Sequence, residues 1–270
     1  MGPHVHNATG PWAAWLTVAV VALAVTYGRG WVRLCLFASN PLPAWRALSF
    51  LAGLASAWVA VASPIGGGDG RLLTFHMIHH LLLMTIAPPL ILLGEPVIAL
   101  WQGWAQEDDA VSGSYRWPTH PRLGHRAVCW LAATATLVVW HVPDAFTLAL
   151  RSPTWHAVEQ VSFFASGLLF WWPVVQPWPS RPDPRWSTVL YLFLATLPCD
   201  ILSGFLVFSD RVAYPVYLST SSPLAVLGDQ QCAGALMWTA VTIVYLVAGV
   251  IVSTRLLTWA SPRHRLAEVV

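Results

Sequence analysis

Three histidines lie close together in one apolar stretch of the sequence, at positions 76, 79 and 80. His76 and His80 are four residues apart, so a helix through this stretch places both imidazoles on one face, about one turn apart. An ionisable side chain in a membrane core costs roughly 2.5–3.5 kcal/mol on insertion scales, so these histidines need partners, water or a metal. The spacing therefore favours a site in which one helix offers two ligands to a single ion.

The types of side chain around the histidines indicate which metal such a site prefers. Imidazole suits copper, zinc, iron and nickel, and thioether ligands shift the preference toward Cu(I). Met77 is adjacent to His76, and Met237 lies in the last apolar stretch. The four cysteines are widely separated and form no Cys-x-x-Cys pair, which argues against a structural zinc site. Copper is the metal we expect, and haem with two axial histidines is the alternative.

The composition is that of an integral membrane protein. Of the 270 residues, 56% are hydrophobic and only 10% are charged. Stretches of about 20 apolar residues, each able to cross a core of about 30 Å, take up most of the length, which predicts a single transmembrane domain over 1–270. The net charge of +2 gives no indication of a nucleic-acid partner. All 14 basic residues are arginine, so a retinal Schiff base, which requires a lysine, is excluded.

Hydropathy predicts an all-α bundle of seven transmembrane helices, bounded by proline, glycine and arginine residues. The predicted spans are 11–28, 43–63, 72–94, 125–142, 154–175, 186–208 and 228–257. Residues 143–153 are expected to form a short interfacial turn. Residues 105–124, which include an acidic run, are expected to form a solvated loop.

The arginines predict how the bundle is oriented, because the cytoplasmic loops of membrane proteins carry the excess of basic residues. If the N-terminus is outside, eleven arginines fall on the inner side, and only Arg71, Arg151 and Arg211 fall outside. We therefore expect the N-terminus outside and the C-terminus in the cytoplasm.

This orientation brings histidine, methionine and carboxylate side chains from distant parts of the sequence to the outer membrane face. Metal sites in helical bundles are built from such convergence. The predicted metal ligands are His76, His80, His141, His156 and His79. Glu159 and Asp229 are expected to orient an imidazole through its free N–H, and Met77 and Met237 are auxiliary. Asp200 is interpreted either as a functional acid or as a carboxylate hydrated where Pro198 opens the helix; Met84 is interpreted as packing.

Several blocks of residues occur in the order typical of one family of membrane proteins, between about residues 70 and 250. They are His76-x-x-x-His80 through Ala87-Pro88-Pro89-Leu90, Leu93-Gly94-Glu95-Pro96, Trp140-His141-x-Pro143, Gly167-Leu168-Leu169-Phe170-Trp171-Trp172-Pro173, Tyr214-Pro215-x-Tyr217 and Asp229-Gln230-Gln231-x-x-Gly234-x-x-Met237-Trp238. With these blocks the chain resembles the polytopic, seven-helix cytochrome c oxidase assembly factor CtaG family.

The resemblance implies a protein of the bacterial cytoplasmic membrane that handles copper for the maturation of a haem-copper oxidase. It implies functional roles for five residues: His76, His80, His141, His156 and Asp229. The chain departs from the family pattern twice. His79 stands where the family usually has Gln, and Gln160 stands where it commonly has a second histidine. We therefore expect His79 and Gln160 to face each other across the site.

Two other functions fit the residues less well. One is a haem-binding electron carrier with histidines from two helices as axial ligands. The other is a copper or proton-coupled transporter, which would need a polar path through the inner half of the bundle, where the sequence offers only Ser, Thr, Cys and aromatic groups. An enzyme is not expected, because no nucleophile and base are paired. The expected partners are oxidase subunits and the lipid bilayer. A homo-oligomer is also possible.

Overall fold

The computed structural model describes residues 11–37, 42–62, 72–104, 126–175, 186–219 and 221–259, and all regular elements in these ranges are helices. The long helices are α1 (Pro11–Phe37), α2 (Ala44–Ala62), α6 (Arg126–His141), α8 (Pro153–Val175), α9 (Trp186–Phe208) and α10 (Pro223–Trp259). One further long helix is made of three consecutive pieces, α3 (Leu73–His80), the π-helix η2 (Leu81–Ile86) and α4 (Ala87–Leu93). The short helices are α5 (Pro96–Trp104), α7 (Pro143–Arg151) and the 3-10 helix η5 (Pro215–Ser219).

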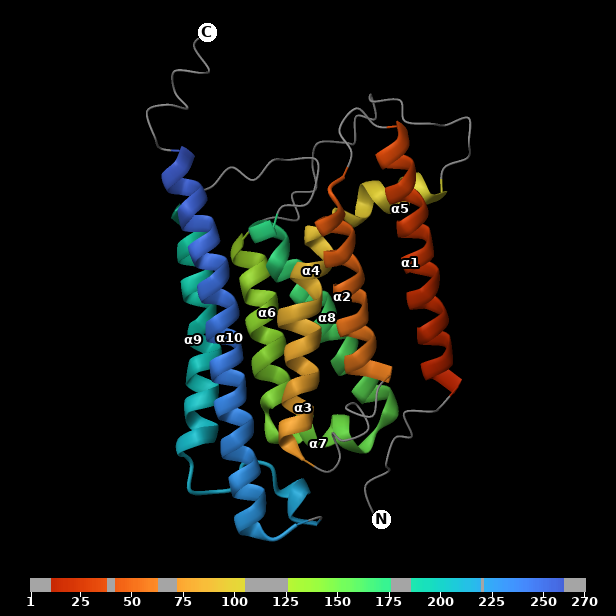
Figure 1. The fold of residues 1–270 in the computed structure, drawn as a ribbon. Helices are drawn as coiled ribbons and strands as arrows, with labels where there is room; N and C mark the ends of the chain where they lie inside the picture. Colours follow the sequence, from red (N-terminus) through yellow and green to blue (C-terminus); the bar gives the residue numbers. More distant parts are fainter. Residues whose placement is uncertain are drawn as a thin grey trace.

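The helices form the all-α membrane bundle that the sequence predicts. Six of the described helices are long and apolar enough to cross a membrane, and α6 with α7, which meet at a bend of 76°, give a seventh span if they are counted as one. The start of α1 and the end of α10 lie at opposite ends of the bundle (Figure 1), as an odd number of crossings requires. Which end faces the cytoplasm stays a prediction.

Three boundaries differ from the predicted ones. Helix α1 continues nine residues beyond the predicted end at 28 and carries Arg33, whose guanidinium donates to the Gln102 carbonyl of α5 at 3.2 Å. Residues 143–151 form α7 instead of a turn, because Pro143 and Asp144 favour the first turn of a helix. Helix α10 begins at Pro223, five residues before the predicted start. The acidic run in 105–124 lies outside the described residues.

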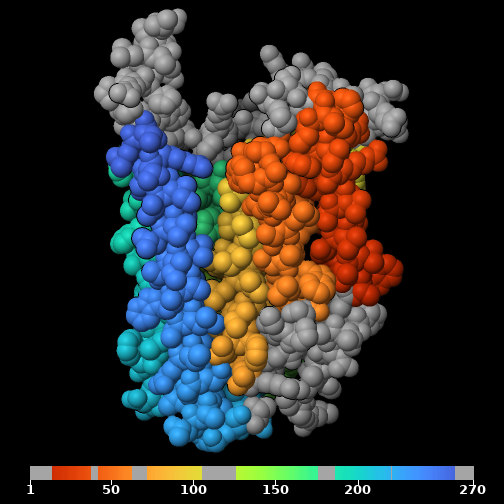
Figure 2. Space-filling model, in the orientation of Figure 1, coloured from red at the N-terminus to blue at the C-terminus, as the bar shows by residue number. Residues whose placement is uncertain are grey.

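The helix made of α3, η2 and α4 is the centre of the bundle. Of its most apolar window 61% is buried, against 17–39% for the other five spans. In Figures 1 and 2 it lies between α2 and α10. The other helices expose large apolar side chains such as Val161, Phe193 and Leu246, as expected of surfaces that face lipid. The histidines of α3 are therefore placed inside the protein and away from lipid.

The π-helix η2 follows directly after the histidines of α3 and has an identifiable cause. Pro88 and Pro89 lack the N–H groups that would bond the preceding turn, so α-helical hydrogen bonding is interrupted. The carbonyl of Met84 instead accepts a hydrogen bond from Trp171 Nε1 of α8 at 3.2 Å. This bond ties the central helix to α8, which carries His156 and Glu159.

Gly167 of α8 makes this close approach sterically feasible. A Cβ atom at this position would lie 2.8 Å from the Met84 carbonyl oxygen and 2.8 Å from Pro88 Cγ. We expect Gly167→Ala to destabilise the protein by about 1–3 kcal/mol, the usual cost of overpacking, as measured by thermal unfolding in detergent. Gly204→Ala on α9 is the control, because nothing lies within 4 Å of its added Cβ. Equal midpoints for the two variants would contradict the account.

Candidate metal centre

The three histidines of α3 are all buried inside the bundle. His76, His79 and His80 have exposed fractions of 1%, 0% and 6%. The rings of His76 and His80 meet edge to face, with their centroids 4.2 Å apart and their Nε2 atoms 2.6 Å apart. The one-turn spacing thus brings two nitrogen donors to one point, as the sequence predicts.

Helix α8 contributes His156 and Glu159 to the same point. Their three-residue spacing places both side chains on the face of α8 that packs toward α3. Glu159 is fully buried, and its Oε1 lies 3.4 Å from His76 Nε2 and 3.3 Å from His80 Nε2. A carboxylate without contact to water is costly unless a positive charge accompanies it. A protonated imidazole or a metal ion could supply that charge here.

His76, His156 and Glu159 form a group that could hold a metal ion, because each offers a ligand atom within 4.8 Å of the other two. An ion bound at about 2.1 Å keeps its ligand atoms roughly 3–4 Å apart, so modest side-chain rotations would bring these atoms to one ion. His80 Nε2 adjoins the same space. We name His76, His80, His156 and Glu159 the histidine site. Three imidazoles and one carboxylate are a donor set suited to copper, zinc or iron.

His141 lies beside this site, at the end of α6, with its ring centroid 6.3 Å from that of His80. Its Nδ1 lies 2.7 Å from the Leu137 carbonyl, which can only accept, so Nδ1 carries the proton. The lone pair of the neutral ring is therefore on Nε2, which is buried and has no hydrogen-bond partner among the described residues. This tautomer is the one that a metal ligand needs.

The helix break after His141 is held by Tyr214, which the sequence analysis names in a family block but does not count among the site residues. Its hydroxyl donates to the His141 carbonyl at 3.1 Å. Burial raises the pKa of Tyr214 above its ordinary range, so the hydroxyl keeps its proton and remains a donor. The ring packs on Phe146 at 4.1 Å, and Phe146 in turn contacts His76 at 4.6 Å. No local pattern in the sequence indicates this long-range support.

His79 and Gln160 both flank His156. The His79 ring lies 5.7 Å from the His156 ring, and the Gln160 amide donates to His156 Nε2 at 3.3 Å. The two side chains thus both adjoin His156. That they face each other across the site stays a prediction.

Asp229 occupies a different position from the one expected of a partner that orients an imidazole. From α10 it accepts hydrogen bonds from the Leu73 N–H at 2.6 Å and from the Thr74 hydroxyl at 2.6 Å. It therefore caps the first turn of α3 and acts on His76 only through the position of that helix. Asp200 is half-buried on α9, and the described residues show no hydrogen bond or ion pair between it and the histidines.

Met77 and Met237 are buried and line a cavity of about 50 Å³. His80 and His141 line the same cavity, so it adjoins the histidine site. Glu159, which the sequence analysis expected to orient an imidazole, could itself offer a ligand atom. The signal that could have indicated this was its three-residue spacing from His156 on an apolar helix.

Comparison with known proteins gives one match. The model of the family described as cytochrome c oxidase caa3 assembly factor matches residues 25–258, a range that includes every site residue discussed above. No curated protein and no solved structure gives a match.

Proposed function

Because the chain belongs to the cytochrome c oxidase caa3 assembly factor family, we propose that it holds copper at the histidine site and presents it to a subunit of a haem-copper oxidase, without turning over a substrate. The multi-pass protein would do so in a bacterial cytoplasmic membrane. If the N-terminus is outside, the site faces outward, since α3 and α1 begin at the same end of the bundle (Figure 1).

The observation that carries the proposal is the buried carboxylate of Glu159 among three imidazoles. It makes ionic contacts with His76 and His80, both on α3. A copper ion would supply the positive charge that this carboxylate needs and would take the nitrogen donors that surround it. His76 lies in the first turn of α3, about 4.5 Å from its start, so an ion has only a short way to travel to or from the membrane surface.

The arrangement of the histidines weighs against the haem alternative. That alternative needs axial histidines from two helices with a porphyrin between their rings, whereas His76 and His80 lie on one helix and contact each other directly. A Soret band in the purified protein would revive that alternative.

The aromatic core at the far end of the bundle weighs against a transporter. Phe170 packs on Tyr191 at 4.9 Å and on Tyr245 at 5.4 Å, and Trp171 packs on Tyr245 at 5.5 Å. These rings fill the region between the cavity and the opposite membrane face, where a transporter needs a polar path.

Deletion of the gene tests the proposed function. We expect the deletion strain to assemble oxidase that contains haem but is depleted of copper, as measured by metal analysis of the purified oxidase. Complementation with the wild-type chain should restore the copper, whereas a His76→Ala/His80→Ala chain of equal abundance should not. Oxidase with its full copper content in the deletion strain would contradict the proposal.

A further inference from the structure

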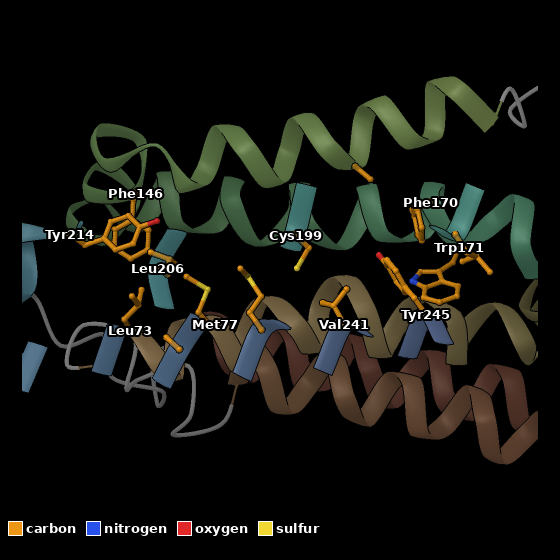
Figure 3. Close-up of a cluster of buried hydrophobic side chains, with 14 of the residues drawn as sticks. Leu73, Met77, Phe146, Phe170, Trp171, Cys199, Leu206, Tyr214, Val241 and Tyr245 are labelled. Atoms are coloured by element: carbon orange, nitrogen blue, oxygen red, sulfur yellow. The ribbon is translucent and has the colours of Figure 1, made fainter. Parts of the chain in front are cut away.

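The cavity beside the histidine site contains an unusual share of the sulfur atoms of the chain. The sequence has four methionines, and all of them except Met1 line this cavity: Met77, Met84 and Met237. They come from α3, η2 and α10. The thiol of Cys199 on α9 lines it as well. In Figure 3 the Met77 and Cys199 side chains point into the space between these helices.

Two imidazoles complete the lining. His141 offers the buried Nε2 lone pair that has no hydrogen-bond partner among the described residues. His80 forms a wall that the cavity shares with the histidine site, because its Nε2 lies 3.3 Å from Glu159 while its ring lines the cavity. The His80 Nδ1 atom has no hydrogen-bond partner among the described residues either.

These donors suit a soft cation of single charge. Thioether ligands prefer Cu(I) and imidazole also suits copper, and both ligands are neutral and need no deprotonation in a cavity of low polarity. One positive charge beside His80 would also lie close to the carboxylate of Glu159. The cavity, at about 50 Å³, is large enough for one ion. Methionine is otherwise an ordinary filler of apolar gaps, so the unpartnered His141 Nε2 is the second observation that points to a ligand.

Aromatic rings lie at both ends of the buried cluster around the cavity (Figure 3). In Figure 3 the rings of Phe170, Trp171 and Tyr245 lie at one end of the buried cluster, and those of Phe146 and Tyr214 lie at the other, with Met77, Cys199 and Val241 between them. The shared wall at His80 therefore makes the histidine site the nearest neighbour of any ion in the cavity.

We propose that this cavity is a second metal site, in which the thioethers of Met77, Met84 and Met237 and the Nε2 atom of His141 bind Cu(I). This second site rests on the proposed function in one respect, the choice of copper as the metal. The protein would then hold copper at two adjoining sites, one built from nitrogen and oxygen donors and one rich in sulfur.

Silver(I), a soft cation that does not change its oxidation state, is the probe for this site. The protein is purified in detergent with the exposed Cys35 and Cys232 replaced by alanine, so that their thiols do not bind silver. We expect Met77→Leu/Met237→Leu to weaken Ag(I) binding at least about tenfold, because leucine conserves the volume but removes the sulfur. Ag K-edge spectra of the parent should show sulfur neighbours. Leu206→Met, a buried change on α9 outside the cavity lining, is the control for repacking and should bind Ag(I) as the parent does.

A His76→Ala/His156→Ala variant separates the two sites. It should keep Ag(I) binding with sulfur neighbours, because neither residue lines the cavity. Equal Ag(I) affinity in the parent and in the methionine variant would overturn the inference, and so would loss of Ag(I) in the histidine variant only. Failure of the proposed function would be seen separately, as full copper content of the oxidase in the deletion strain.

Discussion

Replacement of His76 and His80 by alanine together should abolish copper binding at the histidine site. The two Nε2 atoms are 2.6 Å apart, and both lie within 3.4 Å of Glu159 Oε1, so the double change removes half of the donor set. The loss in copper affinity should exceed the 10–100-fold that is typical when only a partner of a ligand is removed. Competition titration with a copper chelator, together with metal analysis of the purified protein, measures it.

His79→Gln is the matched control for this variant. It removes an equally buried imidazole from the same helix and replaces it with the residue that the family resemblance suggests for this position. This variant should bind as much copper as the wild type. If both variants bind copper with the affinity of the wild type, the metal is held elsewhere and the histidine site is not its location.

Glu159→Gln should remove most of the thermal stabilisation that copper confers, while the metal-free protein keeps nearly its wild-type midpoint. Glutamine preserves the shape of the side chain but lacks the charge that balances the ion. A buried charge contributes little net stability of its own, because its desolvation offsets its ionic contacts. Bound copper, in contrast, can contribute much more, because a ligand at 1,000 times its Kd stabilises the folded protein by about 4 kcal/mol. This stabilisation falls when the affinity for the ligand falls.

Glu95→Gln provides the comparison for Glu159→Gln. Glu95 forms an ion pair with Arg46 at the turn between α4 and α5, away from the histidines. Its replacement should leave the copper-induced shift in the unfolding midpoint unchanged. An equal shift in the wild type and in both variants would show that the Glu159 carboxylate takes no part in binding.

The parts of the site that could be predicted are those fixed by one helix. His76 and His80 meet because residues four apart share a helix face, and this holds whatever packs around them. The predicted membrane bundle is equally local in origin, since each apolar stretch indicates a span by its own length and composition.

The parts that could not be predicted depend on contacts between helices. The ligand position of Glu159 requires α8 to approach α3 closely, which depends on Gly167 and on the hydrogen bond from Trp171 to the Met84 carbonyl. Asp229 was placed at the correct end of the bundle, but a carboxylate there can serve an imidazole or a helix N-terminus, and only the packing of α10 on α3 selects the cap. Met84 was interpreted as packing because nothing in its own segment indicates the cavity that it lines.

The position of copper in the copper-loaded protein tests most directly whether the histidine site binds the metal. Anomalous scattering at the copper edge, recorded from crystals of the purified protein, locates the ion without reference to any variant. We expect anomalous density among His76, His80, His156 and Glu159, at the start of α3 and α8. Copper bound only outside this group, or a loaded protein without density there, would contradict it.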